Sequence, residues 1–344
     1  MTKKNKSAYA QAGVDIDKMM SSLKKIGKKV KSTNTRDVVS ELGSFGGLFK
    51  SPGIDHLLVS SIDGVGTKLK IANMANIHNT VGQDLVNHCV NDILVQGARP
   101  LFFMDYLGAA SLEPKVFEDV LSGFCKACKE NKLALLGGET AEMPGLYPSG
   151  EYDLVGAVIG SVPRKKVITG KKIKNKDIII GLPSSGLHTN GYSLARKIIF
   201  DKCKNKLNDI IPGTKTTFKK YLLAVHKSYL NSVSNVLKKV DVHGMAHITG
   251  GGLLDNIPRI LPNNLNAVVN TSSWKPHKIY SYIQDNGKIN INEMYRVFNM
   301  GIGYILIISP NDLDKTIKIL DNNNQKSKII GTIDKGNKKT ILTN

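Results

Sequence analysis

Hydrophobic and polar residues follow two alternating patterns in the first half of this chain. Four short apolar runs have the composition of strands, and two longer stretches between them have the periodicity of amphipathic helices. The strand-like runs are 57–61, 101–107, 133–136 and 154–162, and the helical stretches are 83–96 and 114–131. Strands that alternate with helices in this way indicate an α/β domain.

A second set of elements follows a basic, turn-rich stretch at 163–176. The predicted elements are strands at 177–182, 267–270 and 302–308 and a helix over 221–239. A chain of 344 residues is also longer than a single compact core usually requires. We therefore predict two α/β domains in series, residues 1–168 and 169–344, with a cleft between them.

The residues before the first strand form a lead-in of a different kind. Their pattern predicts a helix over 15–31, followed by a glycine-rich segment at 43–47. Glycine-rich connecting segments lie at the surface and move readily, so we expect a mobile or lid-like lead-in.

Composition adds a strong positive charge, with 48 Lys and Arg residues against 28 Asp and Glu and a net charge of +20. Such a charge invites a nucleic-acid interpretation. The lysines are nevertheless spread through Asn- and Ile-rich segments such as 171–176 and 326–339, without a basic stripe interleaved with aromatic residues. Nucleic acid is therefore the less favoured ligand, and a basic surface attracts phosphorylated small molecules equally well.

The number of cysteines and the hydropathy of the chain indicate the cellular compartment of the protein. Four scattered cysteines are too few for a disulfide framework, and no apolar stretch reaches the length of a membrane span, so we expect a cytoplasmic protein. Cys125 and Cys128 form a C-x-x-C pair, which is open to a redox or zinc role. Both also fall on the apolar face of a predicted helix, which favours a core position.

Two windows, 71–114 and 133–163, are almost free of positive residues, with Arg99 the exception. In the first window, five polar residues recur at the i, i+3, i+4, i+7, i+8 spacing of one helical face. They are Asp84, Asn87, His88, Asn91 and Asp92. A face of carboxylates and carboxamides without lysine predicts an oxygen-ligand surface for a hard cation such as Mg²⁺, with an ordinary polar surface stripe as the alternative.

Three loops that follow strands carry further candidate chemistry. The first, Asp63-Gly64-Val65-Gly66-Thr67-Lys68, places an acid and two glycines at a strand end, which predicts a phosphate and metal cradle or, alternatively, a tight turn. It lacks the spacing of a Walker A loop. The second, 137–145, sets Glu139 and Glu142 three residues apart, either as paired functional carboxylates or as incidental surface acids.

The third loop, 183–191, runs from a strand into a helix, a geometry that binds phosphate through exposed amides. It contains His188, which is a candidate for proton transfer or for a fixed hydrogen bond. Further along, the triple glycine 250–252 indicates close approach of a ligand or of another strand.

Long motifs in one order run through nearly the whole chain. They are Tyr9-Ala10-Gln11-Ala12-Gly13-Val14-Asp15-Ile16-Asp17, Asp63 to Lys68, Cys89-Val90-Asn91-Asp92, Gly137 to Gly145, His188 to Ser193, Asp241-Val242-His243, Thr249 to Gly252, and Glu293-Met294-Tyr295-Arg296 leading to Phe298-Asn299-Met300-Gly301. Together they resemble the phosphoribosylformylglycinamidine cyclo-ligases, also called aminoimidazole ribonucleotide synthetases.

The resemblance implies a two-domain ATP-dependent synthetase fold of α+β type. The N-terminal sheets of two subunits would join into a barrel-like homodimer, with ATP and Mg²⁺ near that junction and K⁺ as a second candidate cation. The reaction it implies belongs to purine biosynthesis. ATP phosphorylates the formyl oxygen of formylglycinamidine ribonucleotide, an amidine nitrogen attacks that carbon, and phosphate leaves to give aminoimidazole ribonucleotide and ADP.

The resemblance also suggests roles for the residues of the motifs. The metal ligands would be Asp63, Asp84, Asp92 and Glu139. The ATP contacts would be Asp63, Gly64, Gly66, Thr67, Lys68, Asp84, Asn91, Gly138, Glu139 and Thr140. The substrate contacts would be Ser185, Gly186, His188, Asn190 and Gly251, and the catalytic groups Glu142, His188 and Lys68.

The chain departs from the family motif at Val225-His226-Lys227, where Pro-Thr-Arg is usual. If that arginine grips an anion, Lys227 keeps the charge but loses the two-pronged contact. Rivals with the same superfamily fold are selenophosphate synthetase, thiamine-phosphate kinase and a hydrogenase maturation factor. The first typically needs a cysteine or selenocysteine near the N-terminal glycine-rich segment, and no cysteine precedes Cys89.

Overall fold

The strands of the chain form two sheets, one of four strands and one of six, in the part that the structure describes. That structure is a computed structural model, which describes residues 16–38 and 49–344. The glycine-rich segment 43–47, with the lid-like role predicted for it, and residues 9–15 of the first motif lie outside the described ranges. The mixed α/β class predicted from the sequence is confirmed.

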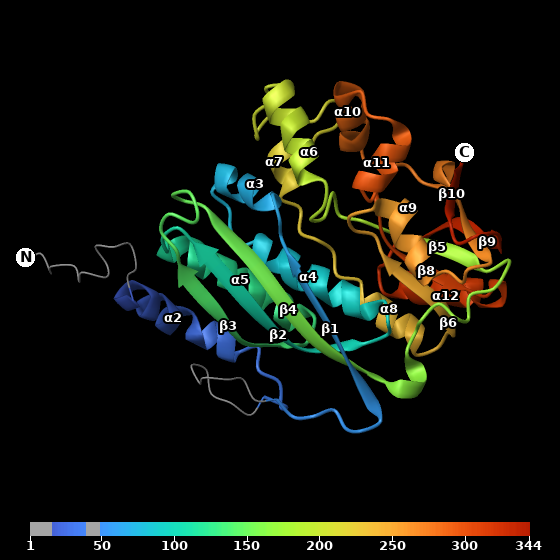
Figure 1. Cartoon of the computed structure of the whole chain (residues 1–344), viewed down its shortest axis with the longest axis horizontal. Helices are drawn as coiled ribbons and strands as arrows, with labels where there is room; N and C mark the ends of the chain where they lie inside the picture. Colours follow the sequence, from blue (N-terminus) through green and yellow to red (C-terminus); the bar gives the residue numbers. More distant parts are fainter. Residues whose placement is uncertain (1–15, 39–48) are drawn as a thin grey trace, which may run out of the picture.

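The N-terminal sheet has the strand order β1-β4-β2-β3. Its strands are β1 (His56–Gly64), β2 (Arg99–Ala109), β3 (Ala134–Glu142) and β4 (Tyr152–Pro163). The helices of this part are α2 (Ile16–Lys31), α3 (Lys68–Ala75), α4 (Val81–Leu94) and α5 (Pro114–Glu130). In Figure 1, α4 and α5 lie along one face of the sheet, and α2 lies beside α5.

Glycine sets the spacing between α4 and α5. A Cβ at Gly82 would lie 2.4 Å from the Val120 carbonyl oxygen, and one at Gly123 would lie 2.6 Å from the Asn79 carbonyl oxygen. The backbones therefore approach more closely than any side chain would allow. Cys125 and Cys128 are buried on α5, so the structure places both thiols in the core, as the helical pattern indicated.

The C-terminal sheet has the order β10-β7-β9-β5-β8-β6. Its strands are β5 (Ile178–Pro183), β6 (Val242–His247), β7 (Leu265–Asn270), β8 (Ile302–Ile308), β9 (Lys328–Lys335) and β10 (Thr340–Thr343). The helices are α6 (Tyr192–Arg196), α7 (Phe218–Leu222), α8 (Leu230–Leu237), α9 (Gly252–Asn256), α10 (Lys278–Gly287), α11 (Ile291–Val297) and α12 (Leu313–Asn322).

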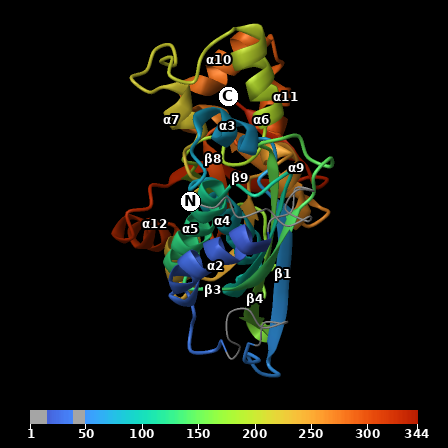
Figure 2. The same cartoon turned by 90° about the vertical axis from the view of Figure 1, so that its left-hand side faces the viewer.

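Helices cover both faces of this second sheet, and β8 is buried along its whole length. Leu306 and Ile308 belong to the cluster that contains the buried residues of α8 and α12. The intervening Ile305 and Ile307 belong to the cluster that contains α9, α10 and α11. Figures 1 and 2 show α6, α7, α10 and α11 gathered at one end of the molecule.

The helix predicted over 221–239 was wrong in its middle. The chain leaves α7 at Leu222 and begins α8 only at Leu230, and residues 223–229 are irregular. The physical reason lies in contacts with α4, described below.

Within residues 16–38 and 49–344, none of the helices combines the length and the apolar character that crossing a bilayer demands.

Candidate functional site

The polar face of α4 lies against the irregular segment 223–229. Asn87 and Asn91 donate from Nδ2 to the carbonyl oxygens of His226 and Lys227, each at 2.8 Å. The Asn91 carboxamide oxygen also accepts the Tyr229 backbone N–H at 3.0 Å. Because a buried irregular backbone cannot satisfy its own polar groups, these side chains supply the missing partners. This contact explains why the face carries no lysine.

Lys68 and Asp84 form a buried ion pair at the centre of this contact. The Lys68 Nζ lies 2.9 and 2.8 Å from the two carboxylate oxygens, and both side chains are 0% exposed. Nζ also donates to the carbonyl oxygens of His188 and Ala224, at 3.2 and 2.7 Å. Burial lowers the pKa of Lys68 and raises that of Asp84, while their mutual attraction opposes both shifts.

The predicted roles of these two residues do not fit this arrangement. All three Lys68 protons are directed at protein oxygens, and Asp84 also accepts the His226 backbone N–H at 2.7 Å. Neither side chain faces open space where a triphosphate or a metal ion would reach it. The pair instead ties α3 and α4 to the C-terminal part of the chain.

Asp63 and Asp92 are the two predicted metal ligands that the structure does bring together. Both face the His88 imidazole, whose Nε2 lies 2.7 Å from Asp63 Oδ2 and 3.7 Å from Asp92 Oδ2. Their side chains are 42% and 28% exposed, so solvent reaches both carboxylates. Burial alone would lower the pKa of His88, but the two carboxylates outweigh it and raise that pKa. The pKa values of Asp63 and Asp92 are lowered, because His88 and His247 more than offset burial.

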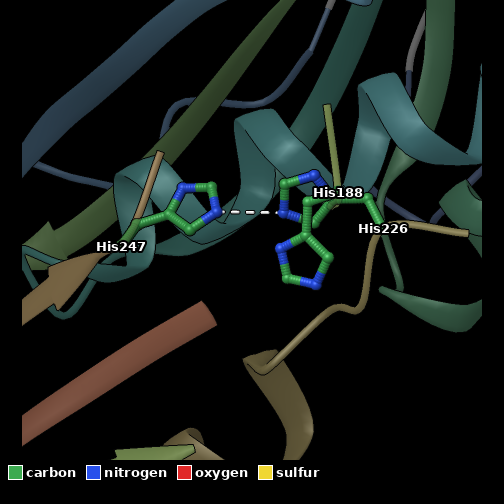
Figure 3. A group of neighbouring side chains, drawn as sticks. All are labelled: His188, His226 and His247. Carbon is green, nitrogen blue, oxygen red and sulfur yellow. Dashed lines mark hydrogen bonds between the residues drawn. The ribbon is translucent and has the colours of Figure 1, made fainter. Parts of the chain in front are cut away.

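Three further histidines adjoin this pair, and Figure 3 shows them with His247 on one side and His188 and His226 on the other. His247 lies 2.8 Å from Asp92 through Nδ1 and 3.0 Å from His226 Nε2 through its own Nε2. The rings of His188 and His226 stack with centroids 3.9 Å apart. Burial lowers the pKa of His247 and pushes those of His188 and His226 well below the usual range.

The glutamates of the second loop lie elsewhere. Across the sheet, Asp63 pairs with Gly156, Gly156 with Asp105, and Asp105 with Gly138. Three strand spacings put the β3 edge roughly 14 Å from Asp63. Glu139 is exposed and accepts the Thr140 N–H at 2.8 Å, and Glu142 accepts the Leu112 N–H at 2.5 Å. The four predicted metal ligands therefore do not meet within one chain.

The glycine loops of the two domains lie near each other. Thr67 Oγ1 is 2.9 Å from Ser193 Oγ, which links the loop after β1 to α6. Gly66 has φ +65° and is exposed, with no atom within 4 Å of a Cβ placed there. Gly64 is half-buried, and a Cβ there would lie 3.3 Å from the Leu154 carbonyl oxygen. The backbone after Asp63 is thus open to a ligand at Gly66.

The predicted substrate residues divide into two groups. Asn190 lies beside Gly250, where a Cβ would be 3.2 Å from its Oδ1, and its Nδ2 is buried without a hydrogen-bond partner in the described part of the chain. Ser185 and Gly186 serve the protein itself, since Ser185 Oγ donates to the Val225 carbonyl and the Gly186 carbonyl accepts from Tyr280 and Asn299.

The last residue of the triple glycine, Gly252, is required by the packing of the backbone. Gly252 has φ +57°, and a Cβ there would lie 2.0 Å from the Tyr295 carbonyl oxygen of α11. Close approach of another backbone, rather than of a ligand, therefore requires that glycine.

Lys227, at the departure from the family motif, lines a cavity of about 590 Å³ together with Asn87 and Ser185. Arg99, Lys132 and Lys238 also line this cavity, and none of the predicted metal ligands does. Burial lowers the pKa of Lys227, whose Nζ lies 5.7 Å from the centre of the Tyr229 ring.

Known proteins resemble this chain over almost its whole length. Residues 48–162 match the family model described as AIR synthase related protein, N-terminal domain, and residues 174–344 match the C-terminal domain of the same family. The phosphoribosylformylglycinamidine cyclo-ligase of Geotalea uraniireducens (strain Rf4) is 49% identical over 330 residues, covering 95% of each chain. The chain belongs to the phosphoribosylformylglycinamidine cyclo-ligase family.

A second relative in the cyclo-ligase family, from Lawsonia intracellularis (strain PHE/MN1-00), is 48% identical over 342 residues and 98% of each chain. Among solved structures, thiamine-monophosphate kinase from Stenotrophomonas maltophilia K279a has a TM-score of 0.67 at 16% identity, covering 93% of this chain and 95% of its own. Hydrogenase maturation protein HypE in complex with ATP has a TM-score of 0.67 at 15% identity, covering 93% and 90%. At such identities the likeness shows the shared fold alone.

Proposed function

We propose that this chain catalyses the ATP-dependent closure of the imidazole ring of 5-aminoimidazole ribonucleotide in purine biosynthesis. The substrate is 2-(formamido)-N1-(5-phosphoribosyl)acetamidine, and the other products are ADP and phosphate. The observation that carries the proposal is the 48–49% identity to cyclo-ligases over 95–98% of both chains. The motifs shared along the chain contain the carboxylates and glycine loops that a phosphoryl transfer requires.

The reaction places definite demands on the protein. The γ-phosphate of ATP is transferred to the formyl oxygen, the amidine nitrogen then bonds to the formyl carbon, and the C–O bond to phosphate breaks. The formyl oxygen is a poor nucleophile, so positioning and charge neutralisation supply most of the catalysis. A bound Mg²⁺ would supply charge neutralisation on the phosphates.

The residues that fit Mg²⁺ are Asp63 and Asp92. Their carboxylates are partly exposed, adjacent, and anionic because their pKa values are lowered. Hard oxygen ligands of this kind suit Mg²⁺. Asp84 does not fit, because it is buried and paired with Lys68. We therefore narrow the metal assignment within one chain to Asp63 and Asp92.

For the nucleotide phosphates, we propose Gly64, Gly66 and Thr67 in the loop after β1. Gly66 leaves backbone amides accessible, and the Thr67 hydroxyl lies at the contact with α6. For the substrate, we propose Asn190 and Gly251, since the unpartnered Asn190 Nδ2 provides a donor for a phosphate or hydroxyl oxygen.

For His188 we propose a positioning role in place of the proton transfer predicted from the sequence. Burial keeps that imidazole neutral near pH 7, so we propose that it positions the loop after β5 rather than carrying a proton. We propose that Glu142 orients the amidine of the substrate. We further propose that Gly138, Glu139 and Thr140 contact the nucleotide.

A homodimer would reconcile these assignments with the single-chain geometry. The sheet face opposite α4 and α5 exposes Leu58, Ile62 and Met104, at 65%, 70% and 41%. Apolar surface of this kind marks an interaction site. We propose that a second copy covers it and that β1 of one subunit meets β3 of the other. Glu139 of the partner subunit would then approach Asp63.

We also propose a cytoplasmic location. The support is that all four cysteines are free thiols, as a reducing compartment would keep them.

The test is to incubate the purified chain with ATP, Mg²⁺ and formylglycinamidine ribonucleotide and to measure ADP and aminoimidazole ribonucleotide together. We expect the two products in equal amounts. ADP release without ring closure would contradict the proposal and favour a kinase instead.

A further inference from the structure

The cavity of about 590 Å³ that Lys227 lines is strongly basic. Its lining carries four cationic side chains and one carboxylate, and these belong to Arg99, Lys132, Lys227, Lys238 and Glu130. Within residues 16–38 and 49–344, none of the four cations forms an ion pair. A cavity of this volume suits a small organic ligand, and the excess of cations favours an anionic one.

Lys227 is a half-buried cation in this lining. Its Nζ lies 5.7 Å from the centre of the Tyr229 ring, and burial lowers its pKa without an opposing carboxylate in the described chain. Removing an ammonium group from water is costly unless an anion pairs with it. An anion in the cavity would supply that partner.

Hydrogen bonds hold another part of the lining in place. Asn131 Nδ2 donates to the Asn87 carboxamide oxygen at 2.7 Å, and Ser228 Oγ donates to the Asn131 carboxamide oxygen at 2.5 Å. All three residues line the cavity. A lining that is already fixed loses little conformational entropy when a ligand binds.

One face of α8 adds neutral polar groups to the lining. Asn231, Ser234, Asn235 and the following Lys238 recur at the i, i+3, i+4, i+7 spacing of a single helical face, and all four line the cavity. The Asn231 and Ser234 side chains make no hydrogen bond to another residue of the described ranges. Carboxamides and hydroxyls both donate and accept, so they suit the hydroxyl groups of a sugar.

We propose that this cavity binds a phosphorylated sugar. Lys227 and the neighbouring cations would hold the phosphate by charge-assisted hydrogen bonds, and the polar face of α8 would hold the sugar hydroxyls. Arg99 and Lys132 come from the N-terminal half of the chain, whereas Lys227 and Lys238 come from the C-terminal half, so the ligand would link the two.

This site is separate from the groups that we assign to ring closure, and it does not depend on that assignment. The lining contains none of the residues proposed above for the metal ion, the nucleotide or the substrate. The proposed substrate also carries a ribose phosphate, so the experiment must distinguish the cavity from the substrate site at Asn190.

The experiment measures the binding of ribose 5-phosphate to the full chain by isothermal titration calorimetry, without ATP or divalent metal. Ribose is the comparison without a phosphate, and we expect only the phosphorylated sugar to bind. Lys227→Met removes the charge and is expected to weaken binding roughly 10-fold or more. Lys227→Arg keeps the charge and is expected to retain binding.

The matched control is Lys239→Met, because Lys239 is exposed and adjoins Lys238 without lining the cavity. It is expected to bind ribose 5-phosphate as the wild type does. Asn190→Ala is expected to keep the binding that depends on Lys227. Loss of all binding in Asn190→Ala would place the sugar phosphate in the proposed substrate site and overturn the proposal.

A second readout uses the wild type alone. With ribose 5-phosphate at about ten times its Kd, acetylation of Lys227, followed by mass spectrometry, is expected to slow roughly tenfold, while acetylation of Lys239 is unchanged. The proposal is overturned if the wild type binds no ribose 5-phosphate, if Lys227→Met binds it as tightly as Lys239→Met, or if Lys227 is not protected.

Discussion

Asp84 and Asp92 lie two helical turns apart on the same face of α4, yet their carboxylates have opposite environments. Asp84 is fully buried and faces the Lys68 ammonium, whereas the Asp92 side chain is 28% exposed and faces two imidazoles. Burial raises the pKa of Asp84, while the histidines hold the pKa of Asp92 below its usual value. At the scale of single residues, the segment that covers α4 therefore buries one acid in an ion pair and leaves the other accessible to solvent.

The Lys68–Asp84 pair predicts strong coupling in a double-mutant cycle. Lys68→Met or Asp84→Asn alone leaves one buried group without its partner, at a cost of about 3–5 kcal/mol. The double variant Lys68→Met/Asp84→Asn is expected to be destabilised by less than the sum, since no charge is left uncompensated. Urea unfolding of the four proteins measures the coupling, and additive losses would contradict the buried pair.

Asp105 predicts a pH dependence of stability. Burial raises its pKa from an ordinary value of 3.8 to about 7, so between these values the folded chain holds a proton that the unfolded chain has lost. Its contribution to stability therefore falls as pH rises from about 4 to 7 and stays low above that.

Asp105→Asn is expected to abolish this decrease of stability with rising pH, and the variant is expected to be more stable than the wild type at pH 8. Unfolding midpoints at pH 5 and pH 8 measure the difference. The exposed Asp241, which pairs with Lys172, supplies the control Asp241→Asn. If the unfolding midpoint of Asp105→Asn changed between pH 5 and pH 8 as much as that of the wild type, this carboxyl would have an ordinary pKa.

At the scale of elements, the sequence predicts seven of the strands in the described part of the chain, but it predicts neither β6, β9 and β10 nor the break between α7 and α8. The apolar runs place β1, β2 and β4 within a few residues of their observed bounds, and β8 at the predicted 302–308. The break depends on side chains more than 130 residues away, since Asn87 and Asn91 bind the backbone of 223–229. A local pattern carries no signal of such partners.

This dependence predicts that Asn91→Ala destabilises the chain. The change removes the partner of the buried Tyr229 N–H, at about 1–3 kcal/mol, and that of the partly buried Lys227 carbonyl. Thermal and urea unfolding measure the loss. Asn263→Ala, at an exposed position, is the control and is expected to stay within about 0.5 kcal/mol of the wild type. Equal stability of the two variants would mean that α4 does not hold the segment.

The candidate site shows the same limit of sequence reasoning. The motifs identify Asp63 and Asp92, because each stands in a recognisable local pattern. They do not show that His88, His226 and His247 gather beside these acids, since the three come from α4, a loop and β6. The lysine-free face of α4, for which the sequence predicts metal binding, is buried at Asp84, Asn87 and Asn91 and partly exposed at Asp92.

At the scale of the whole molecule, the exposed face of the N-terminal sheet predicts a homodimer. Sedimentation at micromolar concentration is expected to give about twice the chain mass of 37.5 kDa. Ile62→Glu places a charge on the 70% exposed position of that face and is expected to shift the chain toward the monomer.

The control for the dimer is Ile210→Glu, which alters a residue that is 59% exposed and lies outside this sheet. It is expected to leave the mass unchanged. A wild-type monomer, or a dimer unaffected by Ile62→Glu, would exclude the proposed interface.

Asp92 and the loop after β1 contact the C-terminal half of the chain, and we propose that Asp63 and Asp92 serve the phosphoryl transfer. The most direct measurement is the rate of aminoimidazole ribonucleotide formation by Asp63→Asn beside Asp241→Asn. We expect a loss of roughly 100-fold or more in kcat for Asp63→Asn, measured where the variant is still folded, and no loss for the control. Wild-type turnover in Asp63→Asn would contradict it.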